Sequence, residues 1–306
     1  MKFGFSLVVR GADATPAGFT AIAERAEALG LDSLWLSAHV ILPPQERSWY
    51  NMVEGRLHPP HWRAGYWEPF TVMSYLAAKT ERITLGTSVV VLPMHNPIEV
   101  AKQAAEVDVL SGGRHVLGIG VGWFEEEFEA LGQSFRDRGA RTDEALALMR
   151  ALWTEEPVTW RGRYYSVADC SFLPKPVQRP VLPLWVAGNG EPAIRRAARF
   201  GQAYHPVRIG VERVGEVRAS LDRHCEAAGR APEEVAIALK LPLTFQDHPP
   251  ADGQFATQGR PADIVDAIRR YRDEGIAHLV MDFVPERLDT ALETMERFAQ
   301  DVRPAL

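Results

Sequence analysis

The chain has 306 residues, of which 46% are hydrophobic, and a formal net charge of -6 at pH 7. This length and apolar content allow a large core, and the mild acidity excludes a global basic field of the kind that binds nucleic acid or an anionic membrane. Cys170 and Cys225 are the only cysteines, so we expect free thiols and a cytoplasmic protein. The apolar run at 3–9 is too short for a membrane span or a signal sequence, and small molecules or another protein are the expected partners.

Apolar segments with strand character alternate along the chain with segments of helical periodicity. The predicted strands are residues 2–9, 33–39, 83–92, 115–121, 183–187, 203–207, 235–243 and 278–284. The predicted helices are residues 16–29, 69–79, 97–110, 124–131 with 142–153, 192–200, 211–228, 261–274 and about 287–302. Eight strand–helix units in a chain of this length predict an α/β fold, a (β/α)8 TIM barrel that forms a single domain over residues 1–306.

Three segments interrupt the alternation and are expected to be insertion loops at the C-terminal face of the barrel, at about 41–67, 154–181 and 244–260. The first is rich in proline, histidine and aromatic residues. We interpret it as a substrate lid, because a loop of that length inside a compact domain usually has a function. The second contains a hairpin-like piece at 158–167, and the third is polar.

Small residues lie near the C-terminal ends of the third and fourth predicted strands. They are Gly86, Thr87 and Ser88 in the first of these, and Gly118, Gly120 and Gly122 in the second. Ligands of parallel α/β sheets bind outside the carboxyl ends of the strands. We therefore expect these glycines to let a flat ring or a phosphate approach the backbone.

Two motifs at strand ends could carry chemistry. His39 ends the second predicted strand, where an imidazole could act as a general acid or base, although it could equally cap the strand. Gly188-Asn189-Gly190 precedes a helix that carries Arg195, and a glycine-rich turn at a helix N-terminus favours an anion such as phosphate. The alternative is a tight turn that only joins strand to helix.

Three consecutive glutamates, Glu125 to Glu127, follow Gly122 and Trp123. Acidic residues in a first helical turn suit the helix dipole, which explains them without a ligand, but Glu126 would lie near any ligand bound over Gly122. The sequence has no convincing metal-ligand spacing and no Gly-x-Ser-x-Gly motif, so we expect no metal and disfavour a hydrolase.

Three long segments together resemble the bacterial luciferase-like superfamily. They are LGTSVVVLPMHNPIEVAKQAAEVDVLSGGRHVLGIGVGWFEEEFEALG, RGARTDEALALMRALWTEEPVTWRGRYYSV and PKPVQRPVLPLWVAGNGEPAIRRAARFG. The likeness covers nearly the whole chain and is greatest to the branch of F420-dependent oxidoreductases. It implies a (β/α)8 barrel, often a homodimer, that binds the deazaflavin coenzyme F420 or FMN at its C-terminal face.

The resemblance also implies roles for individual residues. The cofactor ring would lie against Thr87, Ser88 and Val89, where relatives have a bulge with a non-proline cis peptide, at Ser88-Val89 in this chain. The ribityl chain would pass Gly122 and Glu126, and the phosphate would bind at Gly188, Asn189 and Gly190 with Arg195 nearby. His39 matches the histidine that F420-dependent dehydrogenases place beside the reactive ring carbon.

The chain departs from the family pattern at several positions. Relatives commonly have Asp-His where this chain has Ala38-His39, so the carboxylate that touches the cofactor or supports the histidine is expected to be missing. Trp123 replaces the glutamate that acts as an acid in the sugar-phosphate dehydrogenases. Gly201-Gln202-Ala203-Tyr204 stands in place of Gly-Asp-Gly-Trp. Val121 replaces an arginine that binds the FMN phosphate in bacterial luciferase, which disfavours FMN.

We therefore expect an oxidoreductase that transfers a hydride between F420, or FMN, and a small organic substrate, with His39 moving the accompanying proton. The alternatives are a two-component monooxygenase that uses FMNH2 from a separate reductase, and a non-catalytic flavin-binding protein. For each aromatic residue of the expected substrate wall, ordinary packing is the alternative. The expected wall residues are Tyr50, His61, Trp62, Trp67, His95, Trp185 and His205.

Overall fold

The structure is a computed structural model that describes residues 1–42, 65–283 and 287–306. The strands are β1 (Lys2–Ser6), β2 (Ser33–Leu36), β3 (Thr84–Thr87), β4 (Val90–Val91), β5 (His115–Gly120), β6 (Val158–Arg161), β7 (Ser166–Cys170), β8 (Leu184–Ala187), β9 (Ala203–His205), β10 (Ala236–Phe245), β11 (Gln258–Gly259) and β12 (Ile276–Phe283). The α-helices are α1 (Pro16–Ala28), α2 (Pro69–Ala77), α3 (Pro97–Leu110), α4 (Glu125–Ala130), α5 (Arg138–Thr154), α6 (Glu191–Phe200), α7 (Val214–Ala227), α8 (Pro261–Asp273) and α9 (Leu288–Arg297).

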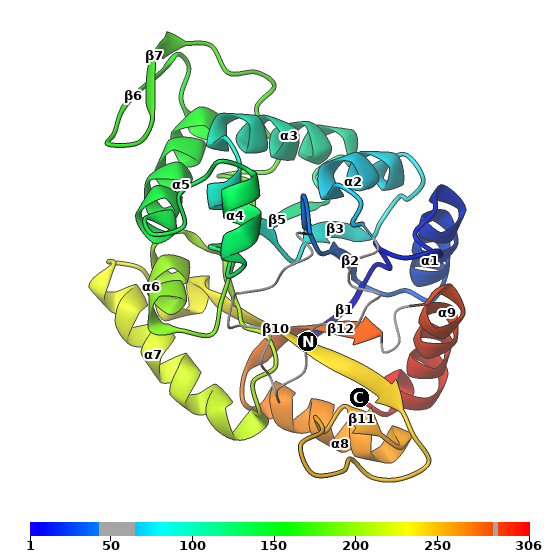
Figure 1. Ribbon diagram of the computed structural model, residues 1–306. Helices are drawn as coiled ribbons and strands as arrows, with labels where there is room; N and C mark the ends of the chain where they lie inside the picture. The colour runs from blue at the N-terminus through cyan, green and yellow to red at the C-terminus, as the bar shows by residue number, and fades with distance from the viewer. Residues whose placement is uncertain (43–64, 284–286) are drawn as a thin grey trace.

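Eight strands form a closed parallel barrel in the order β1-β2-β3-β5-β8-β9-β10-β12, and β12 pairs again with β1. The helices surround this barrel (Figure 1). The predicted (β/α)8 fold is thus confirmed. Because all eight strands run in the same direction, their C-terminal ends meet at one face, where barrel enzymes place their sites.

Several helices begin where the sequence supplies a side-chain cap followed by proline. Thr15 accepts the backbone N–H of Gly18 at the start of α1, Glu68 accepts those of Phe70 and Thr71 at α2, and Asn96 accepts that of Ile98 at α3. These bonds satisfy donors that have no partner inside the helix, and proline at the first position loses no hydrogen bond there.

The barrel interior is filled by aromatic side chains from opposite strands. Trp35 of β2 stacks on Trp185 of β8 with ring centroids 4.0 Å apart, and its indole Nε1 donates to Ser33 Oγ at 2.7 Å. A Cβ added at Gly86 would lie 2.3 Å from the Trp35 ring, so only glycine fits at this position of β3 beside the indole. A Cβ at Gly118 would lie 1.9 Å from the Thr87 carbonyl oxygen. The expectation that these two glycines leave room for a ligand is therefore wrong, because protein atoms fill the space.

The single strand predicted at 83–92 is divided in the structure. β3 ends at Thr87, a cis peptide joins Ser88 to Val89, and the short β4 follows and pairs with β5. The non-proline cis peptide implied by the family resemblance is thus confirmed. Its position at the end of β3 places the bulge at the mouth of the barrel.

Two of the three expected insertions fall within the described residues. The segment 154–181 contains the antiparallel hairpin β6–β7, which projects beyond α5 (Figure 1). The segment 244–260 contains β11, which adds to the end of β10. Most of the expected lid, including Tyr50, His61 and Trp62, lies outside the described residues. Within the described part of the chain, no helix is long and apolar enough to span a bilayer.

Candidate functional site

His39 lies beyond the C-terminal end of β2 and is held by a buried glutamate from α4. Its Nδ1 lies 2.8 Å from Glu127 Oε2, and the Glu127 side chain is fully buried. The other carboxylate oxygen, Oε1, accepts the backbone N–H of Val40 at 2.6 Å and that of Ile41 at 3.3 Å. One carboxylate therefore fixes both the imidazole ring and the backbone that follows it.

The expectation that the supporting carboxylate is missing is wrong, because Glu127 supplies it from a different element. Sequence reasoning chose Glu126 and explained its neighbours by the helix dipole. The signal for Glu127 was its spacing: it shares a helix face with Phe124, Phe128 and Leu131, at positions i, i+3, i+4 and i+7, and both phenylalanines are buried. A glutamate on an apolar face needs a partner, and here the partner is His39.

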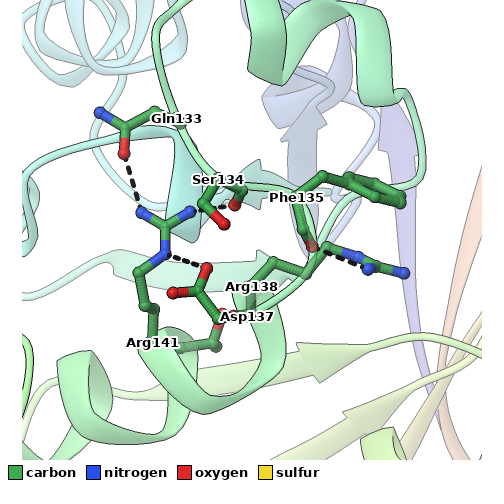
Figure 2. Close-up of polar contacts among 7 residues, drawn as sticks. Gln133, Ser134, Phe135, Asp137, Arg138 and Arg141 are labelled. Atoms are coloured by element: carbon green, nitrogen blue, oxygen red, sulfur yellow. Dashed lines mark hydrogen bonds and ion pairs between the residues drawn. The ribbon is translucent and has the colours of Figure 1, made fainter.

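The segment after α4 braces this short helix against the barrel. Arg138 donates from Nε to the carbonyl of Gly122 at 3.1 Å and lies over the Phe135 ring, 3.7 Å from its centroid. The Phe135 ring in turn meets Phe128 of α4 edge-on. Figure 2 shows that the nearby Arg141 guanidinium donates hydrogen bonds to Gln133, Ser134 and Asp137. These contacts connect α5 and the loop before it to Gly122, which precedes α4, and to Phe128 within α4.

The bulge at the end of β3 is fixed by side chains on both sides. Thr87 Oγ1 donates to the Gly118 carbonyl at 2.7 Å and accepts the Gly118 N–H at 2.8 Å. Ser88 Oγ lies 2.9 Å from His205 Nε2, and His205 Nδ1 lies 2.6 Å from the Ala238 carbonyl. Since a carbonyl only accepts, Nδ1 carries the proton, and Ser88 donates to Nε2. Burial lowers the pKa of His205 to about 4, in keeping with the neutral ring that this chain of bonds needs.

The half-buried Val89 side chain lies against β5, and the neighbouring glycines give it space. A Cβ at Gly120 would approach Val89 Cγ2 to 2.9 Å. At Gly122, which has φ +79°, a Cβ would lie 2.5 Å from Val91. Glycine is thus required at both positions by packing. The proposed contact of Gly122 with a cofactor can involve only its backbone.

The turn between β8 and α6 is held by two contacts from β9 and the residues after it. Tyr204 Oη donates to the Gly188 carbonyl at 2.6 Å, and the Asn189 side chain exchanges two hydrogen bonds with the backbone of Val207. Within the described part of the chain, the N–H groups of Asn189 and Gly190 donate to no protein acceptor. Arg195 is exposed on the second turn of α6. Backbone donors and a nearby guanidinium at a helix N-terminus together suit an anion.

Sequence reasoning missed a charged pair inside the mouth of the barrel. The Lys240 ammonium of β10 lies 3.1 Å from Asp282 Oδ1 of β12, and Ser6 at the end of β1 donates to the same carboxylate. Lys240 is 8% exposed and the Asp282 side chain is 18% exposed, so Lys240 is buried while Asp282 keeps some contact with solvent. Each of these residues lies in a strand that otherwise reads as apolar, and only the closure of the barrel brings them together.

The expected substrate wall is dispersed in the structure. Trp67 packs edge-on against Phe19 of α1, with ring centroids 5.3 Å apart. Trp185 and His205 are buried beneath the mouth of the barrel. His95 lines a cavity of about 320 Å³ together with Asn96, Gln133, Arg141, Tyr164 and Tyr165, and burial lowers its pKa. Contact of these four residues with a substrate stays a prediction.

The family model that matches this chain and two of its curated relatives are of the luciferase-like or F420-dependent kind. Residues 1–251 match the family model of luciferase-like monooxygenases. The chain is 32% identical to an F420-dependent glucose-6-phosphate dehydrogenase of Intrasporangium calvum, with 92% of each chain covered. It is 31% identical to the enzyme of the same name from Kineococcus radiotolerans, with 95% of this chain and 93% of the relative covered.

Solved structures share the fold at lower sequence identity. An F420-dependent secondary alcohol dehydrogenase in complex with an F420-acetone adduct superposes with a TM-score of 0.80 at 19% identity, covering 99% of this chain and 98% of that one. The monooxygenase RslO1 from Streptomyces bottropensis gives the same TM-score of 0.80 at 24% identity, covering 99% of each chain. At these identities the likeness concerns the barrel architecture.

Proposed function

Because the chain belongs to the luciferase-like monooxygenase family, we propose that it is an oxidoreductase that transfers a hydride between coenzyme F420 and a small organic substrate. The observation that carries the proposal is the histidine at the end of β2 with its buried glutamate partner. A fully buried carboxylate bonded to a strand-end imidazole is costly to maintain and is typical of groups that exchange protons in catalysis.

The described residues fit a phosphorylated ring cofactor in two places. The bulge Thr87-Ser88-Val89 presents backbone and the half-buried Val89 side chain at the mouth, the surface that a flat ring needs. In the turn Gly188-Asn189-Gly190, the N–H groups of Asn189 and Gly190 have no acceptor among the described residues, and Arg195 adds positive charge. Gly122 precedes α4 and Glu126 lies in its first turn, along the proposed course of the ribityl chain.

In the proposed reaction the bound cofactor supplies or receives the hydride. His39 holds the accompanying proton at one ring nitrogen and passes it to or from the substrate oxygen. The rings of Trp123 and Phe124 lie 6.2 and 6.4 Å from that of His39, whose side chain is 11% exposed, so little water reaches the imidazole. Geometry and proton transfer therefore account for the contribution of the protein, and no nucleophilic side chain is required.

The test begins with separate titrations of the purified protein with oxidised and reduced F420 and FMN, followed by fluorescence. We expect tight binding of F420. Turnover is then followed by deazaflavin absorbance with glucose 6-phosphate, 2-propanol and acetone as probes. His39→Ala should keep the F420 affinity and lower turnover by roughly two to four orders of magnitude. Unchanged turnover in that variant would remove His39 from the mechanism.

Oxygen uptake with FMNH2 and no reaction with F420 would indicate a monooxygenase instead. Binding of either cofactor without turnover would indicate a non-catalytic flavin-binding protein.

Three further expectations are part of the proposal: a cytoplasmic location, a homodimer, and a separate reductase that supplies the reduced cofactor if the reaction consumes it. The free thiols of Cys170 and Cys225 support the first. Val109 and Leu110 at the end of α3 have exposed apolar side chains, and so has Val177, whose N–H is bonded to Asp108 of the same helix. They support the second expectation, since exposed apolar surface often marks a protein interface. Light scattering of the purified protein gives the oligomeric state.

A further inference from the structure

We infer that Glu127 is the positioning residue of this site and that it determines which nitrogen of His39 moves the proton. The inference rests on the proposed function for the role of His39 in turnover, but its structural content concerns this chain alone. The carboxylate fixes His39 as the tautomer that is protonated at Nδ1. Nε2 is then the nitrogen that can accept a proton and return it.

The assignment follows from the hydrogen bonds of the carboxylate. Oε1 already accepts from the backbone of Val40 and Ile41, and an ionised carboxylate has no proton to donate. The imidazole nitrogen that faces Oε2 at 2.8 Å must therefore be the donor. A ring so fixed at Nδ1 is oriented as well as protonated on a defined side, which is the usual effect of a carboxylate behind a working histidine.

The same carboxylate also fixes the backbone through which the chain leaves the barrel. Val40 and Ile41 are exposed at their side chains, so apolar packing does not hold this segment. Their N–H groups, bonded to Oε1, fix it instead. Loss of the carboxylate charge would thus affect the direction of the imidazole and of the following backbone together, while leaving the bulge and the β8–α6 turn as they are.

Glutamine at this position makes a sharp test because it has the same shape. In Glu127→Gln the carbonyl oxygen can still accept from Val40, and the amide nitrogen then faces Nδ1 as a donor. The imidazole has to present a lone pair at Nδ1, so the tautomer is reversed to Nε2–H. We expect the 15N chemical shifts of the His39 ring nitrogens to exchange their pattern, with His39 identified as the signal that is absent in His39→Ala.

Glu27 provides a matched control. Its carboxylate accepts the backbone N–H groups of Glu81, Arg82 and Ile83 in the loop before β3, at the opposite end of the barrel. Glu27→Gln therefore weakens hydrogen bonds from backbone amides to a carboxylate, as Glu127→Gln does, but away from the site. Its thermal stability should fall, but its turnover should equal that of the wild type.

With the probe that gives the highest rate, Glu127→Gln should lower kcat about 10- to 100-fold and leave KM and the F420 dissociation constant within about two-fold. The double variant His39→Ala/Glu127→Gln should be no slower than His39→Ala, because both changes remove the same function.

Normal turnover in Glu127→Gln with slow turnover in His39→Ala would overturn the inference and leave the proposed function standing. Normal turnover in His39→Ala would remove the proposed function of that histidine instead. A wild-type spectrum with the proton on Nε2 overturns the inference without any variant.

Discussion

Substituting Gly86 by alanine tests whether the glycines of the barrel serve packing or ligand binding. The added methyl carbon would lie 2.3, 2.5 and 2.8 Å from three atoms of the Trp35 ring, so the indole has to move. It has little freedom to do so, because it stacks on Trp185 at 4.0 Å and donates to Ser33 at 2.7 Å. Overpacking of a core costs about 1–3 kcal/mol, and we expect Gly86→Ala near the upper end of that range.

The measurement is the free energy of unfolding in urea together with the F420 dissociation constant. Gly215→Ala in α7 is the control, since its methyl would meet only Glu274 at 3.5 Å and alanine favours a helix by about 0.5–1 kcal/mol. Trp35→Phe should relieve much of the cost of Gly86→Ala, giving a favourable coupling in the double variant. Unchanged stability of Gly86→Ala with weakened cofactor binding would refute the packing argument and restore the ligand interpretation.

Three other predictions address polar groups of the barrel and the β6–β7 hairpin. Burial lowers the pKa of His115 and His205 to about 4 and that of His278 to about 3. Because the unfolded chain then binds protons that the folded barrel does not, the free energy of unfolding should fall as the pH drops from about 6.5 towards 4, by up to about 3 kcal/mol per histidine; a flat profile between pH 7 and 5 would contradict this. Tyr204→Phe loses the bond to the Gly188 carbonyl and should raise the F420 dissociation constant about five-fold, the equivalent of about 1 kcal/mol, without changing kcat, as checked by titration and steady-state kinetics. Glu144 accepts the N–H groups of Arg163, Tyr164 and Tyr165, so Glu144→Gln should speed proteolysis within the β6–β7 hairpin at unchanged global stability; equal cleavage rates would show that the hairpin does not depend on this clamp.

The order of strands and helices could be predicted because it depends on local sequence patterns. Apolar runs, capping residues and proline at helix starts are properties of short windows, and right-handed parallel crossovers leave few topologies for eight such units. The observed boundaries differ from the predicted ones where tertiary contacts decide them. α5 begins at Arg138, four residues before the predicted start at 142, because Arg138 and Arg141 donate to Phe135, Gln133 and Ser134 of the preceding loop and Gly139 is tolerated in the first turn.

The sequence by itself determined the barrel, the approximate positions of its strands and the histidine that follows β2, since each depends on periodicity or on residue type at a known place. Only the tertiary structure decided that Glu127 and not Glu126 meets that histidine, that Trp35 occupies the space beside Gly86, and that Lys240 faces Asp282. These pairs join residues 42 to 88 positions apart in the chain. A side chain's neighbour across a barrel depends on strand register and on the closure of the sheet, which no local pattern of residues records.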